Sequence, residues 1–518
     1  MHVTGELEAS EGRPHLASSV LSRPAQRQDE VELLPLDSQR VQPGNDTDSE
    51  PDTLIDPEEL KLPKISSLVI IIVSNILMQV SFFIIVPASN DYANHLGGDS
   101  TFSGIVIGIP TVFSAIAVLP LLRYDKGGYS LPLNVCCGAS ILGHILYALA
   151  YKLNFLYLIL IGRIINGFAF TMWMYCKRYC SDARIVGIRR RTTLASFLVV
   201  GQGLGMSLGP FAGGLFYKVG FKGSVFNGYT SPGWVMAGVW SVFWVCVRMF
   251  YVDVGEGDRY PENRPTTTQS LPNPQKPTEQ PVSTTSPSLT PPEKKSSSSL
   301  PPLPTHPQNQ SKLRTLLQTY QMTPSQWGVL GCMCWFALTC FFILGAWESN
   351  LPVFGSSTPQ FHWSPTASGN FIALGGISAF PFLLLTIFLI RRIEDRKILV
   401  LGSCLGLSSL LVFLSLLRTG RINYGSVFMC WWATALGFNM ASVVPVSLLS
   451  KQLPPKWNSW VSLAIQYSMY TGRVSGAIWG GSGVKVGMEV YTGLEIGVVG
   501  IGLVMVGILW DGLKAKKG

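Results

Sequence analysis

Long apolar runs recur along the chain, and the short polar segments between them hold most of its charges. Each run has about 20 residues, the length that an α-helix needs to cross roughly 30 Å of hydrocarbon. The pattern therefore predicts an all-α membrane protein. Its twelve transmembrane helices should cover residues 65–87, 102–122, 132–151, 155–176, 192–217, 232–250, 325–347, 367–390, 398–417, 423–450, 457–481 and 489–510.

The spans form two six-helix halves, over residues 65–250 and 324–510, and the remaining segments differ in composition. Between residues 261 and 310 the chain has 13 Pro and 16 Ser or Thr, and such a segment cannot bury enough apolar surface to fold. We expect a disordered linker at 251–323, a disordered polar tail at 1–64 without a secretory signal, and a short tail at 511–518.

The composition and the placement of charges agree with this topology. Hydrophobic residues make up 47% of the chain and charged residues only 13%. The net charge of +9 could suggest nucleic acid. However, with an inner N-terminus, the short inner loops and the C-terminal tail carry 17 Lys and Arg, and the outer loops carry six. This positive-inside bias places both termini and the linker in the cytosol and argues against a nucleic-acid partner.

The reactive residue types show no catalytic pattern. The ten cysteines fall within or near the spans, where thiols behave as small hydrophobic groups. The six histidines are scattered, and we find no nucleophile motif, phosphate loop or metal-ligand spacing. We therefore expect no enzyme, no metal and no cofactor, and we expect a monomer.

The fifth span contains the stretch GQGLGMSLGPFAGG, residues 201–214. Its glycines at 201, 205, 209 and 213 repeat every four residues, so they share one helix face, and small residues allow helices to approach closely in lipid. Pro210 should bend the helix, which a bundle tolerates. The stripe either packs tightly or forms a seam against the other half, along which the two halves slide.

Two motifs in this region resemble those of the major facilitator superfamily. The residues Gly205-x-x-x-Gly209-Pro210-x-x-Gly213-Gly214 resemble its antiporter motif, and Arg163-x-x-Asn166-Gly167 resembles its fourth-helix motif. Both occur in the expected helices and order. The resemblance implies two pseudo-symmetric six-helix halves around a central site, with transport by alternating access and a conformational role for Gly205, Gly209, Pro210 and Gly213.

Two inner loops resemble the gating loops of the same superfamily. The segment 123–128 keeps the acid Asp125, a base and glycine of the motif, and its counterpart in the second half is Glu394-Asp395-Arg396-Lys397. The resemblance implies gating contacts of Asp125, Glu394, Asp395 and Arg396.

Several stretches are more specifically similar to the transporter portion of SPX-MFS vacuolar phosphate transporters and of their lysosomal and fungal relatives that lack SPX. The tail before the first span is shorter and more acidic than an SPX module, so we expect none. The resemblance implies transport of phosphate or another small anion across a vacuolar or lysosomal membrane. The similar stretches are FIIVPASNDYANHLG (83–97), GIVIG (104–108), KRYCSD (177–182), SPGWVMA (231–237), ESN (348–350), EDRKILV (394–400) and GRVSG (472–476).

Two arginines lie deep within predicted spans, Arg163 in the fourth and Arg473 in the eleventh. A cation near the middle of a membrane helix costs about 2.5–3.5 kcal/mol on insertion scales, so it usually faces a cavity, a partner or a substrate. A guanidinium fork fits the oxygens of carboxylate or phosphate. We expect both arginines to bind an anionic substrate; the alternative is a packing role against backbone carbonyls or an acid.

Polar side chains on other spans complete the predicted lining. Gln466, Tyr470 and Arg473 are spaced by four and three residues and share a helix face, and Asn75 and Gln79 are polar positions of the first span. We expect all of these residues to contact substrate. The alternative for each is a hydrogen bond between helices.

Few acids can carry a coupling proton: Asp91, Glu348, Glu489 and Glu495. Glu348 is the best placed, at the end of the seventh span. An acid that is shielded from water can bind and release a proton near neutral pH. We therefore expect Glu348 to couple transport to protons, unless it is a solvated carboxylate of the outer loop.

The sequence DEVELL has the spacing that sorting adaptors read, with Asp29 followed by Leu33 and Leu34. We expect an adaptor to bind it. Two other functions fit the same fold. One is proton-coupled export of drug-like or amino-acid solutes, which the antiporter-like motif favours, and the other is an anion channel or a sensor that does not transport.

Overall fold

The computed structural model describes residues 60–124, 127–182, 184–220, 223–253, 322–390, 393–452 and 457–514. Residues 1–59 and 515–518 of the predicted tails and most of the predicted linker lie outside the described residues. The sorting sequence around Asp29, Leu33 and Leu34 and the predicted gating residue Asp125 lie outside them as well. In the described part of the chain all regular elements are helices.

Each predicted span of the first half is a helix or a broken helix. The first span breaks after α1, near Pro87, which has no N–H to donate. The fourth span breaks at Thr171, whose hydroxyl donates to Phe168 O at 2.8 Å. The elements are α1 (Ile65–Phe83), the 3-10 helix η2 (Val86–Ala88), α2 (Ser89–His95), α3 (Ser100–Tyr124), α4 (Ser130–Leu153), α5 (Leu156–Phe170), α6 (Met172–Ser181), α7 (Ile188–Val219) and α8 (Ser231–Phe250).

The second half repeats this pattern of six spans. Capping boxes begin two of its helices, with Thr323 and Gln326 at the start of α10 and Asn423 and Ser426 at the start of α13. The elements are α10 (Pro324–Ser357), α11 (Pro365–Ile390), α12 (Asp395–Thr419), α13 (Tyr424–Ser442), α14 (Val444–Gln452), α15 (Asn458–Val486) and α16 (Met488–Ile508).

Among the described residues, eleven helical segments are long and apolar enough to cross a membrane. The remaining predicted span, the eleventh, is α15, which has 29 residues and is long enough. It is less apolar because it contains Gln466, Tyr470 and Arg473 along with several glycines and serines. A span of this kind is stable only where other helices cover its polar face.

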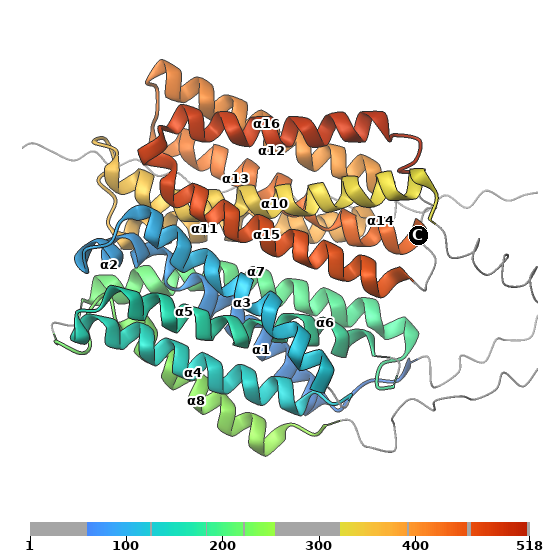
Figure 1. The fold of residues 1–518 in the computed structure, drawn as a ribbon, viewed down its shortest axis with the longest axis horizontal. Helices are drawn as coiled ribbons and strands as arrows, with labels where there is room; N and C mark the ends of the chain where they lie inside the picture. Colours follow the sequence, from blue (N-terminus) through green and yellow to red (C-terminus); the bar gives the residue numbers. More distant parts are fainter. Residues whose placement is uncertain are drawn as a thin grey trace, which may run out of the picture. The chain divides into compact units, whose positions relative to one another are not determined.

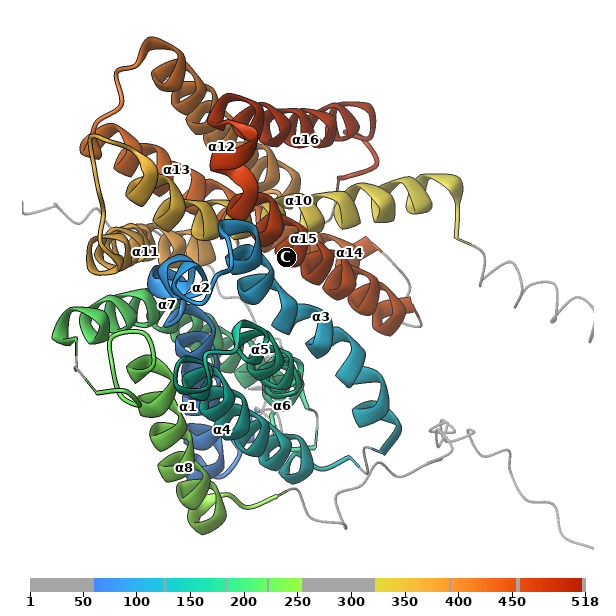
Figure 2. The ribbon, with the colours of Figure 1, turned by 60° about the vertical axis from the view of Figure 1, so that its left-hand side comes forward.

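The spans gather into two groups, α1 to α8 in blue to green and α10 to α16 in yellow to red (Figure 1). The groups meet along two helix pairs, α3 with α15 and α7 with α11 (Figure 2). This arrangement confirms the predicted fold class of two six-helix halves.

The glycine stripe of the fifth span packs against α1. A Cβ atom at Gly205 would lie 2.9 Å from Ile76 O, and one at Gly213 would lie 2.9 Å from the carbonyl carbon of Ile84 and closer still to its oxygen. Since α1 and α7 belong to the same half, the interpretation of the stripe as a seam between halves is wrong. The close backbone approach holds the first half together instead.

The second half contains an equivalent seam between α15 and α10. Gly472, Gly476 and Gly480 repeat every four residues on α15. A Cβ atom at Gly472 would lie 2.9 Å from Leu338 C, and one at Gly476 would lie 2.7 Å from Phe342 C. The first and fifth spans of one half thus pack in the same manner as the first and fifth spans of the other.

A second pair of glycine contacts is repeated as well. Between α4 and α5, a Cβ atom at Gly143 would lie 2.6 Å from Gly162 O. Between α12 and α13, a Cβ atom at Gly402 would lie 2.6 Å from Gly437 O. Both pairs join the third and fourth spans of their half, as pseudo-symmetry requires.

A different face of α7 meets the other half. A Cβ atom at Gly214 would lie 3.1 Å from Thr366 Cα of α11, and Thr366 Oγ1 donates to Gly214 O at 2.8 Å. One and two turns earlier on the same face, Pro210 O lies against Gly369 and Ser207 against Gly376 of α11. Pro210 therefore lies at the contact between halves, whereas the stripe beside it does not.

We name the two ends of the bundle by one residue each. At the Asp99 end, near α2 on the left of Figure 1, Lys485 Nζ of α15 lies 2.5 Å from Asp99 Oδ2, and Ser482 donates to Thr101 at 3.4 Å. At the Arg184 end lie the loops around residues 127–129, 182–187 and 393–394. Within the described ranges, the hydrogen bonds and the ion pair that join the halves lie between the Asp99 end and the middle of the bundle.

Candidate functional site

Arg163 is fully buried on α5, in the middle of the first half. Its Nε donates to Val106 O of α3 at 3.2 Å and its Nη1 to Ser81 O of α1 at 3.4 Å. The guanidinium also lies over two aromatic rings, 5.6 Å from the centroid of Phe82 and 5.9 Å from that of Phe170. Nη2 is buried and has no hydrogen-bond partner in the described part of the chain. Backbone carbonyls thus accept hydrogen bonds from two nitrogens of the guanidinium, and the third nitrogen, Nη2, remains as a donor for another group.

Arg473 and Glu348 form an ion pair inside the second half. Arg473 of α15 is 8% exposed, Glu348 of α10 is fully buried, and Arg473 Nη2 donates to Glu348 Oε2. Glu348 is therefore not a solvated carboxylate of the outer loop. The predicted coupling acid and the second predicted cation meet although 125 positions separate them in the sequence.

One aromatic ring joins the two arginines. Arg473 Cζ lies 4.9 Å from the centroid of Phe82 and 5.2 Å from that of Phe83, both on α1 of the first half. Phe82 is also the ring beneath Arg163, so cations from opposite halves share it. Cation–π contacts are worth about 0.5–2 kcal/mol, more when desolvated. Phe82 was missed from the sequence, because nothing distinguishes it from other apolar residues of its span.

Tyr470 and its neighbours line the contact between α15 and α3. Ser114 Oγ donates to the Tyr470 hydroxyl at 3.2 Å, and Tyr467 donates to Ala115 O at 3.1 Å. Gln466 lies within hydrogen-bonding reach of Tyr470. Tyr470 therefore makes a hydrogen bond between helices of the two halves. This hydrogen bond is the alternative to contact with substrate that the sequence left open.

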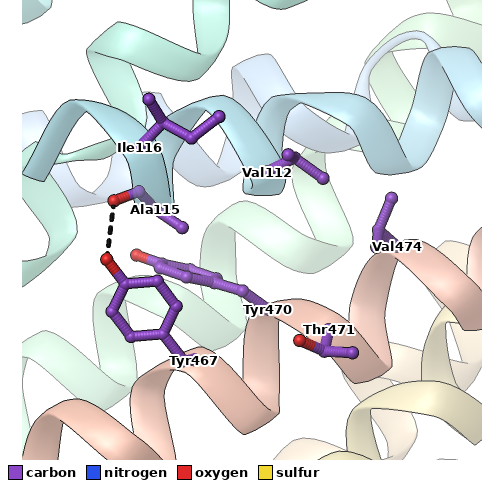
Figure 3. Close-up of a pocket in the computed structure, with 7 residues that line it drawn as sticks. All are labelled: Val112, Ala115, Ile116, Tyr467, Tyr470, Thr471 and Val474. Carbon is purple, nitrogen blue, oxygen red and sulfur yellow. Dashed lines mark hydrogen bonds between the residues drawn. The ribbon is translucent and has the colours of Figure 1, made fainter.

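A cavity of about 230 Å³ lies beside this contact (Figure 3). It is mostly apolar, and the figure shows the Tyr467 and Tyr470 rings next to it. Its lining residues are Val112, Ala115 and Ile116 of α3 and Tyr467, Tyr470, Thr471 and Val474 of α15.

Asn75 and Gln79 lie on the face of α1 that meets α7. Asn75 Nδ2 donates to Leu198 O at 3.0 Å, and the side chain of Gln79 packs where a Cβ atom at Gly205 would stand. Among the described residues neither amide has a hydrogen bond to Arg163 or Arg473. The structure thus places these two residues in the seam of the first half.

The predicted gating residues of the second half contact that same half. Arg396 Nε lies 2.8 Å from Glu394 Oε2, and its Nη1 donates to Trp510 O at 2.9 Å. Asp395 Oδ2 accepts from Ser447 of α14 at 3.1 Å. These contacts fasten the loop before α12 to α14 and to the end of α16.

The Arg184 end of the first half is built around Asp182. Arg184 Nη2 lies 2.5 Å from Asp182 Oδ2 and donates to Gly127 O at 2.7 Å, while the Tyr129 hydroxyl donates to Asp182 at 2.8 Å. Burial raises the pKa of Asp182, but the hydrogen bonds from Arg184 and Tyr129 outweigh it and lower that pKa below its ordinary value of 3.8. The carboxylate is therefore ionised at neutral pH.

Comparisons with known proteins were made on the sequence and on the fold. A family model described as Major Facilitator Superfamily matches residues 71–480. An uncharacterized MFS-type transporter of Schizosaccharomyces pombe is 29% identical over 485 residues, which is 92% of this chain and 87% of that protein. An SPX domain-containing membrane protein of Arabidopsis thaliana is 33% identical over 224 residues, which is 42% of this chain and 32% of that protein.

Solved structures with the same fold include two transporters. A D-xylose-proton symporter superposes with a TM-score of 0.61 at 12% identity, covering 88% of this chain and 99% of that one. The peptide transporter POT, crystallised with sulfate, has a TM-score of 0.59 at 13% identity and covers 88% and 98%. At such identities the likeness concerns the fold alone.

Proposed function

Because the chain belongs to the major facilitator superfamily, we propose that it moves a small inorganic anion, with phosphate as the best candidate, through a site at Arg163 and Arg473. It is a membrane transporter, as predicted, and not an enzyme. The two halves rock about the central site, and the residues between them link one half to the other.

The observation that carries this proposal is the meeting of two buried arginines from opposite halves on the Phe82 ring. Glu348 neutralises Arg473, whereas no acid pairs with Arg163 in the described ranges, so the centre keeps a net positive charge. Nη2 of Arg163 remains as a donor for a substrate oxygen. A tetrahedral oxyanion uses both the charge and the donor.

Glu348 couples the site to protons in this proposal. The anion and the Glu348 carboxylate compete for Arg473, and a proton on Glu348 releases the arginine for the anion. An E348Q variant should therefore bind phosphate with an affinity that varies less steeply with pH than that of the wild type, because the contribution of Glu348 is lost. Persistence of the wild-type pH dependence in that variant would exclude this role.

The test of the anion site is counterflow of radiolabelled phosphate in liposomes that contain the purified protein. R163Q removes a charge-assisted hydrogen bond worth about 1.5–3 kcal/mol, so phosphate affinity should fall roughly 10- to 150-fold. R163K keeps the charge but not the fork, and should fall in between. R421Q changes an exposed arginine in the loop between α12 and α13 and should transport normally. Wild-type counterflow by R163Q would remove Arg163 from the site.

The alternative functions have weaker support. The glycine motif that favoured an exporter packs α7 on α1 within one half, and such packing is compatible with any substrate. The channel alternative predicts current without exchange, whereas saturable counterflow requires a carrier. The counterflow assay therefore also decides between a carrier and a channel.

We further propose that the protein resides in a vacuolar or lysosomal membrane, with the Arg184 end and both termini on the cytosolic side. The excess of Lys and Arg in the loops of that end supports the orientation. Replacing Leu33 and Leu34 by alanine should divert a fluorescently tagged protein to the cell surface. Unchanged targeting of that variant would exclude an adaptor at this sequence.

A further inference from the structure

A second buried acid lies in the second half, away from the arginines. Glu495 of α16 has no exposed surface, and its Oε2 accepts a hydrogen bond from Trp347 Nε1 of α10 at 3.0 Å. Tyr491, one turn earlier on α16, lies beside it and is also fully buried. Both of these groups are neutral, so the neighbours supply no charge to balance a carboxylate.

The helices packed on α16 are α10, α12 and α15, and their charged groups are engaged elsewhere. In the described part of the chain none of their cations contacts Glu495. The pairs are Arg473 with Glu348, Lys485 with Asp99, Arg418 with Glu489, and Arg396 and Lys397 with Glu394; Asp395 accepts from Ser447.

A buried carboxylate without a cation is unstable in its ionised form. Moving an ion of this size out of water costs several kcal/mol even after relaxation, and one neutral donor returns only part of that cost. A carboxylic acid in the same place is neutral and still accepts the hydrogen bond from Trp347. The proton is therefore the ligand that fits this site.

The backbone connects this acid to the proposed anion site. Trp347 and Glu348 are neighbours on α10, and one contacts Glu495 on α16 while the other holds Arg473 on α15. A rearrangement of the Arg473–Glu348 pair that turned this part of α10 would also change the contact between Trp347 and Glu495. Linkage then requires that proton binding at Glu495 and anion binding at Arg473 affect each other reciprocally.

We propose that Glu495 binds a second proton in each transport cycle, in a site formed with Trp347 and Tyr491 and separate from the Arg473–Glu348 pair. The participation in the cycle rests on the proposed transport function, whereas the occupancy of the site by a proton does not. No other ion is required: the site holds H⁺ in the conformation described here, and the cycle requires another conformation in which Glu495 gives the proton up.

Occupancy is tested by infrared spectroscopy of the purified protein at pH 7. A carboxylic acid C=O band should be present in the wild type, absent in E495Q and retained in E489Q, which changes an exposed acid of the same helix. W347F removes the hydrogen bond but keeps the acid, so the band should shift to higher frequency. A band that E495Q leaves unchanged would mean that Glu495 is ionised and would overturn the proposal.

Participation is tested by phosphate accumulation in liposomes with the membrane potential clamped at zero. With a gradient of one pH unit, each coupled proton can sustain about tenfold accumulation. Accumulation by E495Q should therefore fall about tenfold, and its proton-to-phosphate ratio should fall by one, while counterflow continues. Unchanged accumulation, or a loss of counterflow along with it, would overturn the role of Glu495. Absence of counterflow in the wild type would instead overturn the proposed function, and the infrared result would still decide the proton site.

Discussion

Neighbouring glycines of α7 should respond in different ways to the same substitution. Gly213 faces α1 within the first half, and Gly214 faces α11 of the second half. In G213A the new Cβ would lie 2.9 Å from the Ile84 carbonyl carbon, whereas ordinary carbon contacts are about 3.5–4.0 Å. The obstacle is backbone, so α1 and α7 must part and lose packing along their seam.

The structure allows an estimate of both effects. Overpacking costs up to about 3 kcal/mol and alanine returns about 1 kcal/mol of helix propensity, so G213A should lose about 2 kcal/mol of stability. In G214A the Cβ would lie 3.1 Å from Thr366 Cα, an overlap of a few tenths of an ångström. The halves can separate there without unfolding, so about 1 kcal/mol should shift the conformational equilibrium roughly fivefold.

Two measurements separate these outcomes. Thermal melting in detergent, followed by tryptophan fluorescence, should show a lower midpoint for G213A and little change for G214A. G238A, where a Cβ would meet nothing within 4 Å, is the matched control and should not melt earlier. Labelling of S482C by a charged maleimide, with the exposed Cys404 changed to serine, should increase in G214A. A wild-type midpoint for G213A, or equal melting losses in both variants without extra labelling, would refute the assignment of the two faces.

Two further predictions concern the ends of the bundle. D99N should increase S482C labelling because it removes the pair with Lys485. The hydrogen bond from Lys485 keeps the pKa of Asp99 below 3.8. The ratio of labelling between D99N/S482C and S482C, which cancels the slower reaction of thiols in acid, should therefore stay constant down to about pH 4 and approach one only in stronger acid. D182N should lower the melting midpoint at pH 7, and stability should fall by up to about 3–5 kcal/mol, because it removes the carboxylate that pairs with the buried Arg184. The pKa of Asp182 is depressed, so its contribution is present above about pH 3.8 and lost in stronger acid, where the midpoints of variant and wild type should converge.

A labelling ratio that already approaches one at pH 5 would contradict the role given to the Asp99–Lys485 pair. For the Arg184 end, a constant difference in midpoint between D182N and the wild type from pH 7 to pH 3 would exclude a contribution from ionisation of Asp182.

The spans could be predicted from the sequence because length and apolarity decide insertion into a membrane, and even α15 was identified despite Arg473. Which helices pack against each other could not be predicted from the sequence. The glycine stripe shows which face of α7 carries small side chains. Both α1 and α11 are apolar, so the periodicity alone does not show which of these two helices packs on that face.

The contacts of the candidate site could be predicted only in part, for a related reason. An arginine in a span must face something, which identified Arg163 and Arg473, but the pairing of Arg473 with Glu348 depends on how α10 and α15 pack. Asn75 was chosen for its polarity, and its amide instead satisfies the backbone carbonyl of Leu198. Polarity indicates that a side chain needs a partner, but it does not say which partner.

The seams of the first half are complete within residues 65–250. The glycine contacts of these seams join α1 to α7 and α4 to α5, and they need no residue from the second half. During synthesis these helices can therefore assemble as soon as α8 leaves the ribosome, before α10 has been translated. The second half, which has its own equivalent seams, then enters the bilayer beside a first half that is already assembled. The last step is the packing of the second half against the first.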